Sequence, residues 1–223
     1  MPKTVSIAID GPAGAGKSTI ARRLASELNF RYVDTGAIYR AVAVYADRSG
    51  VGLENIADVV ALLPQISVTL KYINGEQRVF LNGEDVSTQI REHRISALTS
   101  ACSAIKEVRA FLLGIQRDIA AKNNVIMDGR DIGTVILPNA QVKIFLTASP
   151  EIRAERRYKE LVEKGENVSY EKILQDVKQR DFNDSTRAEA PLRQAVDAVL
   201  ADTSSMTLQE STDMIINMIK EQM

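Results

Sequence analysis

The feature that most constrains the fold is the stretch SIAIDGPAGAGKSTIARRL, residues 6–24. Its apolar run ends in a glycine-rich loop that matches G-x-x-x-x-G-K-[ST], and a helical pattern follows directly. Gly11, Gly14 and Gly16 allow backbone conformations that a Cβ would obstruct, so successive N–H groups can point at phosphate oxygens. A strand, a tight anion-binding loop and a helix in this order predict the first unit of a parallel α/β sheet.

Short apolar runs recur along the chain and are separated by helical patterns. Near-continuous hydrophobic strands that alternate with helices indicate a parallel sheet covered on both faces. We therefore expect an α/β fold, a three-layer core around a five-stranded parallel sheet. The five runs are Val5–Ile9, Tyr32–Val33, Val125–Met127, Val142–Leu146 and Val196–Leu200.

One region departs from this α/β pattern. Between Ile66 and Val86 the residues alternate, and the pairs Asn74-Gly75 and Asn82-Gly83 are strong hairpin signals. The stretch predicts a small antiparallel meander inserted into the parallel core.

The 223 residues, 45% of them apolar, suit one domain with two excursions. The expected core spans 1–62 and 96–223, and the insert spans 63–95. A short, highly charged helical lid is expected over 153–170.

Composition excludes several classes of function. The 28 basic and 29 acidic residues nearly cancel, which argues against binding to a nucleic-acid polymer or an anionic membrane. No apolar stretch approaches the roughly 18 residues of a membrane span. The lone Cys102 excludes an internal disulfide and fits a buried apolar role, and a single histidine argues against a Ser-His-Asp triad. A cytoplasmic protein is expected.

The glycine loop predicts a site for a nucleoside triphosphate. Lys17 would supply charge to the β and γ phosphates, while the Ser18 hydroxyl suits a magnesium ligand. Asp128, after the third run, lies where a second carboxylate for magnesium is expected, although a turn-forming Asp-Gly would look the same. The loop residues expected to contact the triphosphate are Gly11, Pro12, Ala13, Gly14, Ala15, Gly16, Lys17, Ser18 and Thr19.

The loop alone leaves the reaction open, because switch GTPases, motor ATPases and small-molecule kinases share it. The chain lacks the guanine-reading Asn-Lys-x-Asp of a GTPase, and a motor would commonly be larger. Four other stretches are rich in charge: DTGAIYR (34–40), DGRDIGT (128–134), EIRAERR (151–157) and RDFNDSTRAEAPL (180–192). Because arginine forks bind phosphate bidentately, these stretches predict a site for a second phosphorylated molecule.

Less specific interpretations exist for some of these residues. Arg153, Arg156 and Arg157 could solvate an exposed helix face, and Arg180 with Asp184 could form a surface ion pair. Asp-Thr-Gly also marks aspartic proteases, but that chemistry needs two such carboxylates in an all-β fold, and the chain has no second copy.

The motifs IDGPAGAGKST, DTGAIYR, DGRDIGT and RDFNDSTRAEAPL, in this order, resemble those of bacterial cytidylate kinases along nearly the whole chain. The resemblance implies transfer of the γ-phosphoryl group of ATP to CMP or dCMP, with Mg²⁺. It also implies that the insert binds the monophosphate and that residues 153–170 form the lid.

The resemblance further assigns roles to single residues. It implies that Thr35 binds substrate. Family members commonly have a serine at this position, and the threonine of this chain keeps the hydroxyl group. Of the lid arginines, Arg153 and Arg157 are expected, with Lys17, to neutralise charge on the transferring group. Ser100, Arg109 and Asp131 would face the cytosine, Arg180 and Asp184 would hold the sugar hydroxyls, and Arg40, Arg130 and Arg187 would bind the acceptor phosphate.

Physical chemistry supports the base assignment, because a carboxylate can accept from the exocyclic amine of cytosine, where uracil offers only a carbonyl. Two other functions stay open: a P-loop kinase acting on UMP, AMP or a non-nucleotide, and a non-catalytic nucleotide-binding module. The expected partner is a small molecule, and the expected state is a monomer.

Overall fold

The computed structural model describes residues 4–222, apart from the side chains of residues 93, 97 and 208. Its contacts divide the chain into two compact units. The first comprises Met1–Arg31 and Asn123–Met223, and the second comprises Tyr32–Lys122. Each unit has its own architecture.

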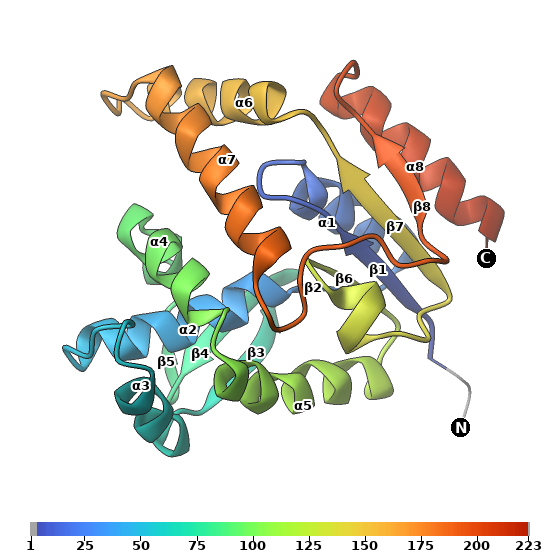
Figure 1. The fold of residues 1–223 in the computed structure, drawn as a ribbon. Coiled ribbons are helices and arrows are strands. Elements are labelled where there is room, and N and C mark those ends of the chain that lie inside the picture. The colour runs from blue at the N-terminus through green and yellow to red at the C-terminus, as the bar shows by residue number, and fades with distance from the viewer. Residues whose placement is uncertain (1–3, 223) are drawn as a thin grey trace. The chain divides into compact units, whose positions relative to one another are not determined.

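The first unit is built on parallel strands, as expected. Strand β1 pairs in parallel with β6 and β7, and β7 pairs in parallel with β8. With β2, the five-stranded order is β2-β6-β1-β7-β8, which confirms the predicted fold class (Figure 1). Side chains of the three central strands are almost entirely buried, as near-continuous apolar sequence requires. The strands of the first unit are β1 (Ser6–Asp10), β6 (Val125–Gly129), β7 (Val142–Thr147) and β8 (Val199–Asp202), whereas β2 (Arg31–Asp34) begins at the last residue before the second unit.

The fifth expected strand was wrong at its start. The apolar run begins at Val196, but this side chain is fully exposed and β8 begins only at Val199. The Ala198 N–H donates to the Ala195 carbonyl at 3.0 Å, so the chain turns before it joins the sheet. The run from Val196 to Leu200 therefore covers two different environments, a solvent-exposed turn and then a strand.

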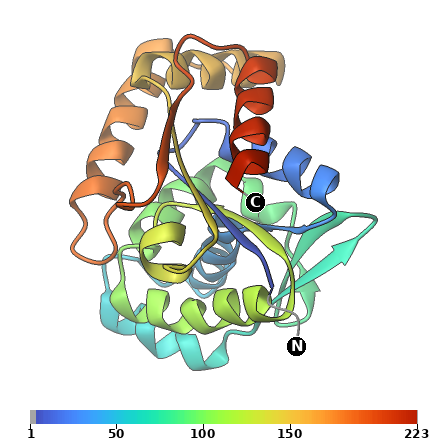
Figure 2. The same cartoon turned by 90° about the vertical axis from the view of Figure 1, so that its right-hand side faces the viewer.

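Helices of the first unit cover the sheet and extend beyond it. Helices α1 and α8 lie side by side on one face of the sheet (Figures 1 and 2). Helices α6 and α7 form a hairpin that follows β7, where the charged lid was expected. The elements are α1 (Lys17–Leu28), the π-helical turn η3 (Ile132–Ile136), α6 (Pro150–Glu163), α7 (Tyr170–Thr186) and α8 (Leu208–Gln222).

Local sequence signals explain where these helices begin. The Ser149 hydroxyl caps α6 by accepting from the Ile152 N–H, and Pro150 occupies its first turn. Thr207 and Glu210 form the capping box ahead of α8: the Thr207 N–H donates to Glu210 Oε2 at 2.8 Å, and the Glu210 N–H donates to Thr207 Oγ1 at 3.2 Å. No helix over residues 4–222 is long and apolar enough to cross a membrane.

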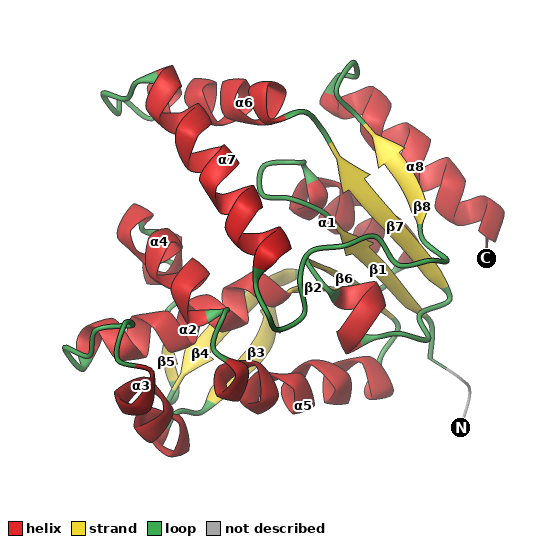
Figure 3. Ribbon diagram, in the orientation of Figure 1, coloured by secondary structure: helices red, strands yellow, loops and turns green. Residues whose placement is uncertain are grey.

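The second unit contains the predicted meander as a three-stranded antiparallel sheet (Figure 3). Asn74 and Asn82 adopt left-handed φ of 54° and 49°, and a glycine follows each, which suits tight hairpin turns. The strands are β3 (Val68–Ile73), β4 (Glu76–Leu81) and β5 (Glu84–Asp85), and the helices are α2 (Thr35–Arg48), α3 (Ile56–Leu62), η1 (Leu63–Gln65), η2 (Gln89–Arg91), α4 (His93–Cys102) and α5 (Lys106–Lys122).

A single hydrophobic core joins the helices and sheet of this unit. Its buried residues come from α2, β3, β4, α4 and α5. The expected insert, 63–95, therefore forms part of a larger unit that also contains α2 and α5. Cys102 is fully buried in this core, and burial raises the pKa of its thiol to about 12, which confirms its apolar role.

Candidate active site

The glycine loop leaves β1 through a backbone that only glycine tolerates. Gly11 has φ +148°, and a Cβ added there would lie 1.9 Å from the backbone oxygen of Leu146. Gly14 and Gly16 also have positive φ, and Gly16 immediately precedes α1. The loop thus delivers its N–H groups to the positive end of a helix, which is the geometry of a phosphate site.

Replacing Gly11 with alanine is expected to destabilise the protein by about 1–3 kcal/mol, because the Cβ combines a strained φ with a backbone clash. Urea unfolding would measure the loss. Gly50→Ala is the matched control, because Gly50 also has a positive φ but its Cβ would meet nothing within 4 Å. Equal losses in the two variants would show that φ alone matters and that the Leu146 contact does not.

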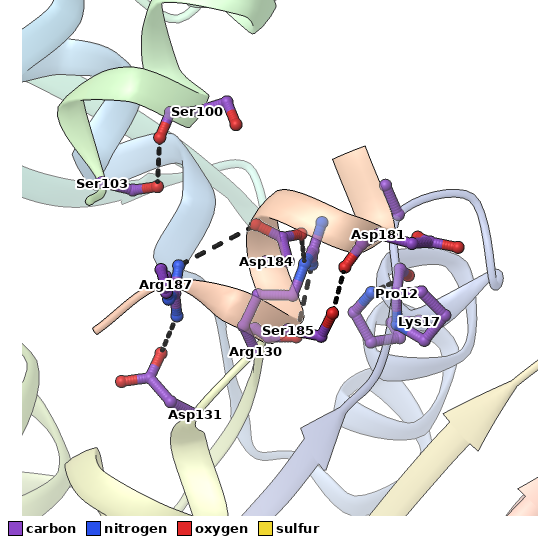
Figure 4. Close-up of polar contacts among 12 residues, drawn as sticks. Pro12, Lys17, Ser100, Ser103, Arg130, Asp131, Asp181, Asp184, Ser185 and Arg187 are labelled. Carbon is purple, nitrogen blue, oxygen red and sulfur yellow. Dashed lines mark hydrogen bonds and ion pairs between the residues drawn. The ribbon is translucent and has the colours of Figure 1, made fainter. Parts of the chain in front are cut away.

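Lys17 lies over the loop that it follows. Its Nζ donates to the carbonyl oxygen of Pro12 at 2.6 Å (Figure 4). Burial, with a further contribution from the nearby Arg130 charge, lowers the pKa of Lys17 to about 7. The charged form of Lys17 is therefore disfavoured in the protein alone, and the negative charge of a bound polyphosphate would stabilise it.

The two candidate magnesium residues are brought together. Ser18 Oγ donates to Asp128 Oδ2 at 2.8 Å, although the residues lie on α1 and at the end of β6. No cluster of three or more His, Cys, Asp or Glu suited to a metal occurs within residues 4–222. A hydroxyl and one carboxylate nevertheless fit Mg²⁺, which commonly takes its other ligands from substrate phosphates and water.

Asp184 organises a buried cluster of arginines. Arg130 Nε donates to Asp184 Oδ2 at 2.8 Å, and Arg187 Nη1 lies 3.9 Å from Asp184 Oδ1. Figure 4 shows Asp184 between these two guanidinium groups. Burial by itself would raise the pKa of Asp184, but the charges of Arg130, Arg180 and Arg187 hold it below its usual value. Asp184 is therefore not half of an exposed ion pair.

Asp131 belongs to the same cluster. Its Oδ1 lies 3.5 Å from Nη2 of Arg187, and both side chains are nearly fully buried. The guanidinium groups of Arg130, Arg180 and Arg187 act on the Asp184 carboxylate, and the Asp131 carboxylate lies beside Arg187. Guanidinium groups gathered near the end of β6 suit an anionic ligand.

Asp10 is a residue that the sequence analysis missed. Its carboxylate accepts from the N–H groups of Ile132 and Gly133, each at 2.7 Å, and so fixes the start of η3 to the end of β1. Burial raises the pKa of Asp10 to about 6. The available signal was a carboxylate at the end of an otherwise apolar run, but its partners lie over 120 residues away.

The three lid arginines differ. Arg153 is 2% exposed and donates to main-chain oxygens of Ala148 and Ala13. Arg156 donates to the carbonyl of Thr203 at 3.1 Å. Arg157 is 39% exposed and pairs with Glu160 at 2.9 Å. Simple solvation of an exposed face is therefore wrong for Arg153 and Arg156, and it fits Arg157.

The remaining predicted residues lie in the second unit. Thr35 begins α2 and is buried, beside Asp34, whose side chain caps the helix. Arg40 lies one turn further along α2 and is partly buried. These residues follow β2, so the end of this strand also carries polar groups suited to a ligand.

Ser100 and Arg109 are linked by a residue that the sequence analysis missed. Ser103 Oγ donates to the Ser100 carbonyl at 3.0 Å (Figure 4). The Ser103 carbonyl accepts from Arg109 Nη1 at 3.1 Å. The Arg109 guanidinium also lies 5.5 Å from the ring centroid of Tyr39. The junction between α4 and α5 therefore holds the Arg109 guanidinium close to the main chain of Ser100.

Comparisons with known proteins identify the family of this chain. A family model described as cytidylate kinase matches residues 7–221. The cytidylate kinase of Caldicellulosiruptor saccharolyticus is 47% identical over 97% of this chain and 96% of its own length. That of Caldanaerobacter subterraneus subsp. tengcongensis is 50% identical over 98% and 96%. A crystal structure of an uncharacterised Eubacterium ventriosum protein, 15% identical with a TM-score of 0.53 over 98% of this chain and 99% of that one, shares the fold. The chain belongs to the cytidylate kinase family.

Proposed function

We propose that this protein transfers the γ-phosphoryl group of ATP to CMP, giving CDP and ADP, and that it also accepts dCMP. The observation that carries the proposal is the pairing of a triphosphate loop with a cationic cluster in one unit. The Arg130 charge helps to lower the pKa of Lys17, so the two groups lie within electrostatic range. Two anions placed at these sites would meet end to end.

The chemistry requires positioning and neutralisation of charge. Phosphoryl transfer passes through a loose transition state, so placement and electrostatic stabilisation supply most of the catalysis. Lys17 would neutralise the transferring oxygens together with the lid arginines Arg153 and Arg157, of which Arg157 is the more exposed. No general base is obligatory, because the acceptor is already an anionic phosphate. Closure of the α6–α7 hairpin would exclude water from the reaction.

The magnesium proposal follows from the paired ligands. Ser18 and Asp128 would hold Mg²⁺, which when bound neutralises charge on the donor phosphates. The Ser18 hydroxyl donates its hydrogen to Asp128, so the lone pairs of its oxygen remain available to a cation.

The acceptor residues are assigned by their chemistry and family position. Ser100, Arg109 and Asp131 would face the cytosine, with Thr35 also in contact with the substrate. The sugar hydroxyls would meet Arg180 and Asp184. We propose that the acceptor phosphate binds Arg40, Arg130 and Arg187.

A coupled assay of ADP formation across CMP, dCMP, UMP and AMP would test the proposal. CMP is expected to give the highest kcat/KM, with a lower value for UMP. A clear preference for AMP or UMP would identify a different monophosphate kinase. ADP formation that does not depend on any added monophosphate would leave only a nucleotide-binding or hydrolytic role.

Asp131→Ala is expected to lower the preference for CMP over UMP by about 1–3 kcal/mol, or roughly 5–150-fold in the ratio of kcat/KM. The carboxylate would no longer accept from the cytosine amine. Measuring the ratio, and not CMP turnover alone, controls for any displacement of Arg187, because that change affects both acceptors. An unchanged ratio would remove Asp131 from base recognition.

We also propose a monomer that acts in the cytoplasm, where ATP and pyrimidine monophosphates occur. Sedimentation velocity at micromolar concentration would test the monomer. No nucleic-acid or membrane partner is needed for this reaction.

A further inference from the structure

Arg153 joins three segments of the first unit through one side chain. Its Nε donates to the Ala148 carbonyl at the end of β7, at 2.8 Å. Its Nη1 donates at 3.0 Å both to the Ala13 carbonyl in the phosphate loop and to Asp181 Oδ1 on α7. A further bond joins its Nη2 to Asp181 Oδ2. The guanidinium is thus held by the protein and is only 2% exposed.

The contact with the loop is close at more than one point. A Cβ added to Gly14 would lie 3.3 Å from Cβ of Arg153, so the start of α6 packs directly on the loop. Because a guanidinium is a planar fork with fixed donor directions, a displacement of Ala13 would be transmitted to Asp181. Lysine offers a single point of charge and could not maintain all these bonds.

Asp181 lies at the functional end of α7. It is adjacent to Arg180 and one helical turn before Asp184, which contacts Arg130. The helix then ends and leads directly to Arg187. Arg180, Asp184 and Arg187, which are proposed to bind the acceptor, therefore lie in the same short segment as Asp181, to which Arg153 is hydrogen-bonded.

We propose that the Arg153–Asp181 pair is a bridge that positions the phosphate loop and the acceptor-binding end of α7 together, so that donor and acceptor binding are coupled. The inference rests on the proposed function, because it takes the loop as the ATP site and α7 as part of the acceptor site. Asp181 acts as a positioning residue, since it works through Arg153. Arg153 would accordingly influence phosphoryl transfer through its bond to the main chain of the loop at Ala13.

The chain offers a matched control between the same two helices. Lys178 Nζ on α7 lies 2.9 Å from Glu151 Oε1 on α6, and both side chains are more than half exposed. Glu151 lies within electrostatic range of Arg153, but Glu151→Gln breaks the ion pair with Lys178 and leaves the bonded partners of Arg153 unchanged. The comparison separates a general role in holding α6 to α7 from a specific connection to the phosphate loop.

The test measures CMP affinity by calorimetry with and without a non-hydrolysable ATP analogue and Mg²⁺. In the wild type the analogue is expected to change CMP affinity by about fivefold or more. Asp181→Asn should reduce this factor to about twofold or less, while Glu151→Gln keeps the wild-type factor. A merely structural role would lower Tm and weaken CMP binding equally in both states, leaving the factor unchanged.

The inference is overturned if the wild type shows no coupling, if Asp181→Asn retains it, or if Glu151→Gln loses it equally. Arg153→Lys, which keeps the charge but not the fork, replaces Asp181→Asn if that variant does not fold, and it should reduce the factor in the same way. Wild-type CMP turnover is assayed separately. Its absence would refute the proposed function, whereas turnover without coupling would refute only the bridge.

Discussion

Lys17→Ala is expected to reduce kcat by about 10²–10³-fold, because the variant loses a preorganised charge aimed at the transferring phosphoryl group. Lys17 Nζ now donates to the Pro12 carbonyl, so it is already held at the loop. Steady-state assays at saturating ATP and CMP would give kcat. The loss should appear chiefly in kcat, since the interaction strengthens as charge develops in the transition state.

The fold is expected to survive this change. Burial lowers the pKa of Lys17 to about 7, so the charged form is poorly accommodated before nucleotide binds. Removing a group whose ionised form is disfavoured should cost little stability, and a thermal melt would verify this. Arg22→Ala, an outward-facing change on the same helix, provides a control for activity. Near-normal kcat in Lys17→Ala would exclude the proposed role of this residue.

Asp184→Asn is expected to destabilise the protein by about 3–5 kcal/mol, because it leaves the buried guanidinium groups of Arg130 and Arg187 without their shared carboxylate. Urea unfolding at pH 7 would measure the effect. Glu151→Gln, which breaks an exposed pair, should cost far less, because solvent screens that pair. Similar costs for the two variants would mean that the buried cluster contributes no more than a surface ion pair.

The same variant predicts a dependence on pH. The arginines hold the pKa of Asp184 below its ordinary value of 3.8. The stability contributed by the ionised carboxylate is thus fully present above that value and is lost as pH falls through the lower folded-state pKa. The difference between wild type and Asp184→Asn should therefore be constant near neutrality and shrink below about pH 4. A difference that grows on acidification would contradict the assignment.

Features encoded within a few residues were predictable. The glycine loop follows from glycines that tolerate positive φ, and the meander follows from Asn-Gly pairs at its turns. The capping box at Thr207 needs only a partner three residues away. Such signals work because the interacting groups are neighbours in the chain, so no tertiary contact is needed to recognise them.

Features that depend on distant partners were not predictable in the same way. The three lid arginines lie within five residues, yet Arg153 is buried and Arg157 is far more exposed, because the first turn of α6 packs on the loop and Arg157 lies one turn further along the helix. In the sequence, Asp10 is only the last residue of an apolar strand. Its role in binding the N–H groups of Ile132 and Gly133 is visible only once η3 is folded against β1. Val196 continues an apolar run but remains in solvent, since the chain turns before β8.

The sequence by itself determined the α/β class, the phosphate loop and the residue types available for a second anion, because periodicity and backbone preference are local properties. Only the tertiary structure decided that Asp184 is shared by Arg130 and Arg187, that Ser103 links Ser100 to Arg109, and that Asp181 reaches the loop through Arg153. The strengths of these pairs depend on burial and on distances between atoms far apart in the chain, and both are fixed only when the elements pack.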